Sequence, residues 1–304
     1  MKKLIILILV CTPFMLSAQV LTKKDLKDRS YGAKKLKKAP REIYINSFYI
    51  DYQTYKAVSA SAASGFNKST ASIAVGMISE LSPEDFQQIT DKAYARAEKK
   101  LKEAGFRIVP AEEAKDIDMF KKLDMIKGGT NITGTSVNTI PSNKSFFYKP
   151  STLDNSPKLS KQLGDIPVFE LAIQVNFVEL MRDNIGTGST SVKGKVDLTF
   201  FPSISRVVWS NGGIMGAAKT MVIFDSKGRP IEIPGVIKSQ KLKEYANAKG
   251  KTDYITGTKY NVKEKIEVSH PVNIDRDLYI KQVDTYINAY VDILVDEFLE
   301  YAVK

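Results

Sequence analysis

The chain has 304 residues, of which 43% are hydrophobic and 26% charged, a composition that is ordinary for a globular protein. Lysine and arginine number 45 against 34 aspartate and glutamate residues, which gives a formal net charge of +11, and there is one cysteine and one histidine. So few thiol and imidazole groups exclude a zinc site built from Cys and His, and they exclude a small module held together by disulfides.

The first eighteen residues predict a secretory signal peptide. Lys2 and Lys3 form a positive start, residues 4–10 form a short apolar core, and small residues up to Ala18 fit a cleavage site. The apolar run is shorter than the ~20 residues that a membrane anchor needs. Cleavage would also remove Cys11, whose preceding residue does not suit lipidation. We expect an exported protein that is periplasmic, associated with the outer membrane, or secreted.

A lysine-rich segment follows the predicted signal peptide. From Leu21 to Glu42 there are nine basic residues and three acidic ones. A charged run of this kind is most often a solvated tail or linker. The alternative is an arm that contacts anionic lipid headgroups, lipopolysaccharide or an acidic partner, since export makes nucleic acid an implausible target. The candidate contact residues are Lys23, Lys24, Lys27, Lys34, Lys35, Lys37, Lys38 and Arg41.

A strand–helix–strand unit is the firmest structural prediction. Residues 42–50 are rich in β-branched and aromatic side chains and predict an interior strand. Ser82 and Pro83 are typical of a helix start, and apolar residues then recur at three- and four-residue steps until Gly105, a natural helix end. Residues 106–110 predict a short second strand.

Between this first strand and the helix lies a stretch dominated by alanine and serine, from Tyr55 to Ile78, with a turn-like Gly65-Phe66-Asn67. Each arm is about nine residues, near the length of a strand that spans a bilayer, so several subunits could combine such hairpins into a barrel. Few of the side chains are apolar enough to favour lipid. The alternatives are a flexible loop or a strand pair whose small residues permit close packing.

The second half of the chain predicts a sheet and a long helix. Residues 111–126 suggest a short helix, and residues 128–162 are rich in loop-forming residues. Alternating apolar residues over 169–177 and 192–200 predict two antiparallel strands, and residues 221–233 predict a hairpin. A long amphipathic helix closes the chain from about Asp275. The fold class is α+β, or α/β with a mixed, largely antiparallel sheet.

No catalytic, metal or cofactor site is evident in the sequence. His270 is the only histidine, no Gly-x-Ser-x-Gly elbow accompanies it, and no phosphate-binding glycine loop is present. A pair of carboxylates needs no local motif, so a glycosidase-like arrangement stays open, but no residues can be assigned to it. No local pattern distinguishes the following acidic residues from ordinary surface, strand or helix-capping positions: Asp116, Asp118, Glu170, Glu179, Asp275 and Asp277.

The order of elements resembles that of the periplasmic α/β domains in the curli secretion channel (CsgG) and in the amino-terminal part of TolB. The residues that carry this resemblance are the opening strand 43–48 (IYINSF), which ends in Phe, and the strand entry 105–109 (GFRIV) after the helix. Separately, residues 88–94 resemble a helix of exported bacterial proteins. The resemblance implies an envelope protein with an assembly or secretion role.

Three functions stay open on the sequence. The first is an exported, non-enzymatic envelope protein with a binding or assembly role, whose partners are envelope proteins, an anionic lipid or lipopolysaccharide surface, or further copies of itself. The second is an oligomeric outer-membrane pore or secretion-channel component that uses residues 55–77, and the third is a carboxylate-dependent hydrolase. The expected organisation is a signal peptide (1–18), a basic arm or linker (19–41) and one large domain (42–304), with a boundary inside 127–165 as the alternative.

Overall fold

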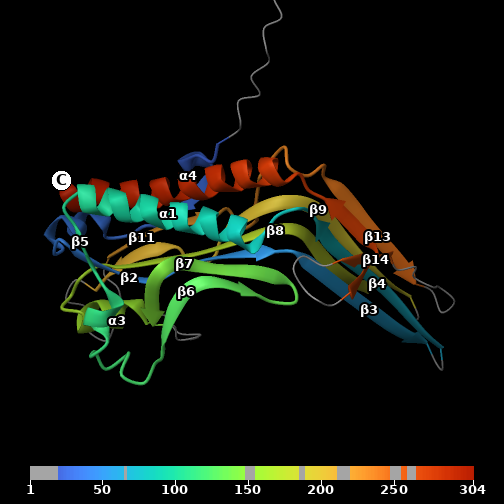
Figure 1. Cartoon of the computed structure of the whole chain (residues 1–304), viewed down its shortest axis with the longest axis horizontal. Helices are drawn as coiled ribbons and strands as arrows, with labels where there is room; N and C mark the ends of the chain where they lie inside the picture. The colour runs from blue at the N-terminus through green and yellow to red at the C-terminus, as the bar shows by residue number, and fades with distance from the viewer. Residues whose placement is uncertain are drawn as a thin grey trace, which may run out of the picture.

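The computed structural model describes residues 20–64, 67–147, 155–184, 189–210, 220–246, 255–258 and 265–304. The predicted signal peptide lies outside the described residues. The fold is α+β, as the sequence predicts, with mixed sheets and a long helix at the carboxy-terminal end (Figure 1).

One large mixed sheet organises the molecule, and its strands follow the order β1-β11-β10-β8-β2-β7-β6 (Figure 1). At its centre β2 runs parallel to β8 and β5 and antiparallel to β7, while β9 continues the sheet from β8 and pairs with β12 and β13. The strands are β1 (Leu26–Asp28), β2 (Glu42–Gln53), β5 (Arg107–Val109), β6 (Met125–Ile132), β7 (Ser136–Phe147), β8 (Val168–Asn184), β9 (Thr190–Pro202), β10 (Arg206–Trp209), β11 (Thr220–Ser226), β12 (Ile231–Glu232) and β13 (Gln240–Ala246).

Two long helices, α1 (Pro83–Glu103) and α4 (Arg276–Val303), lie side by side over one face of this sheet (Figure 1). The predicted start of α1 is confirmed, because Ser82 and Asp85 form a reciprocal capping box, and Gly105 adopts a φ of 83° just beyond the helix. Their aromatic side chains interlock with the sheet, for example Phe86 against Tyr52, with ring centroids 4.7 Å apart. The apolar faces of the two helices are therefore the main core.

A smaller layer covers the opposite face of the sheet. It contains α2 (Ala111–Ala114) and α3 (Ser156–Gln162), together with Phe120, which stacks on Phe147 at 4.5 Å. The prediction of a helix over 111–126 is wrong beyond α2, because residues 115–123 form successive turns that bury Phe120 and β6 begins at Met125. Residues 125–147 form the β6–β7 hairpin, where the sequence predicts mostly irregular structure. The strands are not evident in the sequence because polar residues predominate and apolar residues do not alternate regularly.

Other sequence predictions differ in their pairing. The strands predicted at 169–177 and 192–200 do pair, as β8 and β9. A turn with Gly228 at φ 81° follows β11, but β11 and β12 do not form the predicted hairpin, since β11 pairs with β1 and β10 whereas β12 pairs with β9. Strand neighbours that are distant in the sequence decide this arrangement.

The sheet continues beyond the helices as a two-layered projection that we call the β arm (Figure 1). One layer holds the distal parts of β8 and β9 together with β13, and the other has the order β16-β4-β3, with a β14–β15 hairpin beside it. Strand β2 reaches the second layer by continuing through Thr54 into β3. The arm's further strands are β3 (Tyr55–Ser64), β4 (Asn67–Ile78), β14 (Ile255–Thr258), β15 (Lys265–Val268) and β16 (His270–Asn273).

The Ala/Ser stretch is thus a pair of strands and not a loop. Ala60 and Ala71 lie opposite each other and are buried between the two layers, and Ile73 is buried beside them. Small side chains at these positions let the layers approach closely. The close-packing interpretation of this stretch accounts for its composition.

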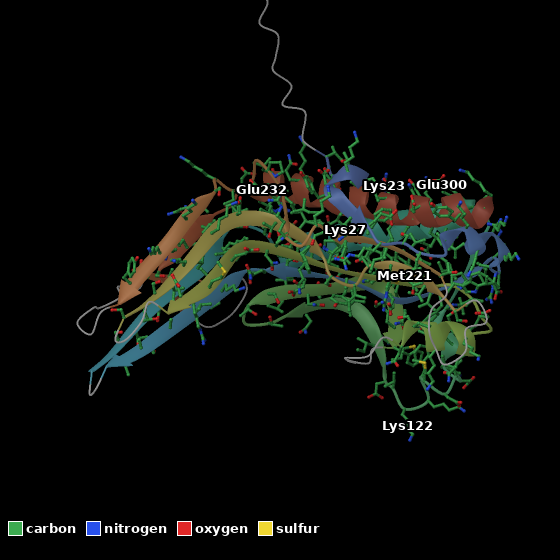
Figure 2. The ribbon with its side chains drawn as sticks, turned by 180° about the vertical axis from the view of Figure 1, so that it is seen from behind. Lys23, Lys27, Lys122, Met221, Glu232 and Glu300 are labelled. Carbon is green, nitrogen blue, oxygen red and sulfur yellow. The ribbon has the colours of Figure 1, made fainter. Side chains whose placement is uncertain are left out.

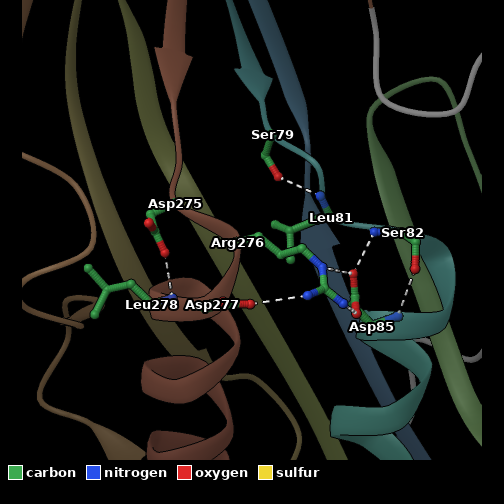
Figure 3. A network of polar contacts seen from close by, with 8 residues as sticks. All are labelled: Ser79, Leu81, Ser82, Asp85, Asp275, Arg276, Asp277 and Leu278. Carbon is green, nitrogen blue, oxygen red and sulfur yellow. Dashed lines mark hydrogen bonds and ion pairs between the residues drawn. The ribbon is translucent and has the colours of Figure 1, made fainter.

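Parallel strands β4 and β16 each lead directly into a helix, β4 into α1 and β16 into α4. At this junction Arg276 donates to both carboxylate oxygens of Asp85, at 2.5 and 3.0 Å (Figure 3). Burial opposes ionisation of Asp85, but the hydrogen bonds from Arg276 and Ser82 prevail and lower its pKa. The ion pair therefore joins the two helices where they leave the arm.

Candidate functional site: the basic amino-terminal segment

The segment that the sequence predicts as a basic arm or linker is packed against the body of the protein. Strand β1 pairs antiparallel with β11, and two short 3₁₀ helices, η1 (Lys23–Asp25) and η2 (Ala33–Lys38), flank it. Leu21, Leu26 and Leu36 are buried in the main core, Leu36 to 1% exposure. A free tail is therefore the wrong description, because these widely spaced leucines bind the segment to β11 and α4.

Three of the basic residues fix the segment in place. Lys23 forms an ion pair with Glu297 of α4, and this hydrogen bond raises the pKa of Lys23 against the opposing effect of partial burial. Arg29 lies 3.2 Å from Asp225 at the end of β11. The Arg41 guanidinium lies 5.2 Å from the ring centroid of Phe106, a cation–π distance. Figure 2 shows Lys23 and Lys27 on the side of the molecule that carries α4.

The remaining lysines face solvent. Within the part of the chain that the structure describes, their side chains make no ion pair, and all are exposed. In η2 the apolar Ala33 and Leu36 point inward, so the charged side chains of this helix point outward on a fixed backbone. The outward-facing residues, which we call the lysine face, are Lys24, Lys27, Lys34, Lys35, Lys37 and Lys38.

A cleft of about 520 Å³ adjoins the segment, between η1, β9 and the turn after β11. Its wall includes the buried Asp197, which accepts a hydrogen bond from Ser239 at 3.2 Å and pairs with Lys195. Lys227, at the rim, donates to the backbone oxygen of Lys24. Acidic and basic side chains line the cleft together, and Lys195 lies between Asp197 and Glu232. No local motif predicts this cleft, because its residues come from four separate segments.

His270 does not complete a catalytic triad. Its Nδ1 lies 2.9 Å from Ser269 Oγ and its Nε2 lies 3.8 Å from Glu244. Ser269 Oγ, however, also accepts from the backbone N–H of Ala74 at 2.9 Å and lies 3.0 Å from its carbonyl oxygen. The half-exposed serine therefore fastens the junction of β15 and β16 to β4, and its hydroxyl is shared with a backbone carbonyl, unlike that of a nucleophile held by one base.

The acidic residues considered in the sequence are dispersed. Glu170 is buried between Arg206 at 2.9 Å and Asn46 at 2.8 Å, whereas Glu179 lines the cleft. Asp118 pairs with Lys121, Asp277 contacts Arg276, and Asp275 caps α4 through the N–H of Leu278. Among the described residues, no group of three or more His, Cys, Asp or Glu side chains is placed to hold a metal ion.

Across the described helices, none combines the length and apolarity needed to cross a membrane. Comparison with protein-family models and with curated proteins finds no match to this chain. The resemblance to the curli channel and to TolB therefore stays a prediction.

Proposed function

We propose that this chain is an exported, non-enzymatic envelope protein that docks on anionic surfaces through its lysine face. The observation that carries the proposal is the set of four lysines on η2, which are exposed, free of ion pairs with described residues, and held on a helix anchored by Leu36. Each lysine near an anionic membrane surface contributes about 1 kcal/mol of attraction. Because the backbone is already ordered, little conformational entropy is lost on docking.

The charges that hold the segment are distinct from those available for binding. Lys23, Arg29 and Arg41 are engaged with Glu297, Asp225 and Phe106, so a partner need not compete with these contacts. Lipid phosphate and lipopolysaccharide phosphate share the same chemistry toward ammonium groups. Both are therefore candidate ligands of the lysine face.

Binding to vesicles tests this proposal. The full chain should cosediment with vesicles that contain anionic lipid and not with neutral vesicles, and added salt should weaken binding because it screens the charges. Replacing Lys34, Lys35, Lys37 and Lys38 together with glutamine should reduce the affinity by about 100-fold or more if each contributes about 1 kcal/mol. Comparing the affinity for vesicles that carry lipopolysaccharide with the affinity for vesicles of anionic phospholipid shows which of the two phosphate sources is the ligand.

A matched control keeps the change in charge constant. Lys115, Lys122, Lys127 and Lys158 are exposed, and Figure 2 places Lys122 at the side of the molecule away from α4. Their replacement by glutamine should change vesicle affinity by about twofold or less, since they lie outside the lysine face. If both quadruple variants lose vesicle affinity equally, the binding depends on net charge alone, and a specific docking surface is refuted.

A pore or secretion-channel component is the second candidate, and the observation that favours it is the long regular hairpin of β3 and β4. The inner face of this hairpin is buried against β8 and β9, and its outer face carries the hydroxyl groups of Ser59, Ser61, Thr70 and Ser72, which favour water over lipid. Insertion would require the arm to open. Leakage of dye from anionic liposomes would support this candidate, whereas binding without leakage supports the first.

A further inference from the structure

The outer edge of β3 is an open strand edge. Strand β3 ends the order β16-β4-β3 and pairs with β4 over its whole length. Among the described residues, no strand pairs with its other edge. An open edge presents a row of backbone N–H and C=O groups, which is the surface that a further strand recognises.

Other edges of the molecule carry features that discourage strand pairing, and β3 does not. Edge strands are commonly protected by short length, charge, proline or an irregular register. Strand β1 has three residues, two of them charged, β16 contains Pro271, and β6 shifts register near Gly128, which packs against the backbone of Pro141. Strand β13 carries Lys241 and Lys243. After Lys56, β3 reads AVSASAAS, without charge, proline or bulge.

The β3 sequence is also complementary to itself in the antiparallel direction. About a centre at Ala60, Ser59 faces Ser61, Val58 faces Ala62, and Ala57 faces Ala63. We propose that β3 is a homodimerisation strand, through which two copies of this chain join their β arms by antiparallel pairing centred on Ala60. A second copy is favoured over an unrelated peptide because antiparallel pairing of two identical strands is a closed two-fold contact, and in this register the alanine, serine and valine side chains from Ala57 to Ala63 lie opposite one another.

The exposed face of the hairpin already uses the contacts that this dimer would extend. Ser59 Oγ lies 2.8 Å from Ser72 Oγ, and Ser61 Oγ lies 2.9 Å from Thr70 Oγ1. A hydroxyl can donate one hydrogen bond and accept two, so Ser59 and Ser61 each retain capacity for a partner. In the dimer, Ser59 of each copy meets Ser61 of the other, and two symmetry-related lines of hydroxyl groups cross both hairpins.

Cysteine crosslinking tests the register. The full chain carries one cysteine, Cys11, so Cys11→Ser gives a background free of thiols. Residues directly opposite each other have Cβ atoms about 5 Å apart, within disulfide reach, whereas diagonal neighbours are about 7–8 Å apart. A mixture of the Ser59→Cys and Ser61→Cys proteins should therefore form disulfide-linked dimers faster than either protein alone.

The matched control is Ser72→Cys, on the same face but one strand away from the edge. It should not crosslink, because its equivalents in the dimer are separated by about three strand spacings of 4.8 Å. Crosslinking of Ser72→Cys at the same rate as the Ser59→Cys and Ser61→Cys mixture, or no crosslinking of that mixture, would overturn the proposal.

Solution mass gives an independent measurement. Light scattering of the unmodified chain should show a mass that rises from monomer to dimer with concentration. The variant Ser59→Lys/Ser61→Lys places like charges opposite each other and should weaken dimerisation by about tenfold or more. The variant Thr70→Lys/Ser72→Lys adds the same charge on β4 and should weaken it by about twofold or less. A chain that stays monomeric at its highest soluble concentration would refute the dimer.

Discussion

The body and the β arm use the same strands but pack them in different ways, and β8 shows the difference within one element. From Val168 to Ile173 every residue of β8 is buried, because helices α1 and α4 cover one face and the small layer around Phe120 lies on the other. From Gln174 onward exposed positions return, since one face of the strand is now open to water. The body buries many aromatic side chains, whereas the arm buries mainly aliphatic ones and, between β3 and β4, the small Ala60 and Ala71.

The largest expected effect is the loss of an aromatic side chain from the body. Phe86 is fully buried and contacts Tyr52 and Tyr279, with ring centroids 4.7 and 5.9 Å apart. Phe86→Ala should lower the free energy of unfolding by about 3–5 kcal/mol, measured by denaturant titration. Tyr245→Ala, at an exposed position of the arm, should change it by about 0.5 kcal/mol or less. Similar losses in both variants would remove the distinction between body and arm.

Enlarging a small residue tests the packing of the arm. Ala71 is fully buried opposite Ala60, so Ala71→Leu should force the two layers apart and lower the free energy of unfolding by about 1–3 kcal/mol. Ala57→Leu adds the same side chain to the exposed face of β3 and should change it by about 0.5 kcal/mol or less. If Ala71→Leu is tolerated equally well, the layers are not closely packed.

The ion pair at the junction of arm and body predicts a dependence on pH. Asp85→Asn should lower the free energy of unfolding at neutral pH by about 1–2 kcal/mol, since a charged hydrogen bond to a partly exposed arginine is lost. The folded pKa of Asp85 lies below its ordinary value of 3.8, so this stabilisation is complete above that value and is lost as the pH falls through the lowered pKa.

Measured against pH, the difference between Asp85→Asn and the unmodified chain should therefore shrink under acid conditions. Asp277→Asn is the control, because Asp277 contacts the same Arg276 at 3.1 Å but is 88% exposed. It should be nearly neutral at every pH. A difference for Asp85→Asn that stays constant down to acid pH would contradict the assignment.

The smallest effect concerns the exposed hydroxyl pairs. Ser72→Ala removes the partner of Ser59 and should lower the free energy of unfolding by about 0.2–1 kcal/mol. Thr285→Ala on α4, where a half-exposed hydroxyl donates to the Lys281 carbonyl of the preceding helical turn, provides the comparison in the body. A loss well above 1 kcal/mol in Ser72→Ala would mean that these hydroxyls hold the hairpin together.

Local signals in the sequence predicted where helices and strands lie better than they predicted which strands pair with one another. Ser82, Pro83 and Gly105 mark the ends of α1, and the alternation in β8 and β9 marks that pair. By contrast, the sheet change at Thr54 has no local signal, and the β6–β7 hairpin lacks a clear apolar alternation. The pairing of β11 with β1 depends on residues almost 200 positions apart.

The sequence predicted which residues make up the candidate site, but it did not predict that the segment is anchored to the body or that a cleft adjoins it. The lysines of residues 23–38 stand out by charge alone, and they are exposed as expected. Their anchoring by Leu21, Leu26 and Leu36 was missed, because three leucines at irregular spacing match neither a helical nor a strand period. The cleft beside them depends on tertiary contacts of η1, β9 and the turn after β11, which spacing in the sequence cannot reveal.

Hydrogen exchange of the full chain, with and without vesicles containing anionic lipid, tests the docking account most directly. We expect added protection over residues 21–41, where the lysine face lies, and no change in strands β3 and β4 beyond that seen with neutral vesicles. Protection or deprotection centred on β3 and β4, with residues 21–41 unchanged, would contradict docking through the lysine face and favour entry of the β arm into the membrane.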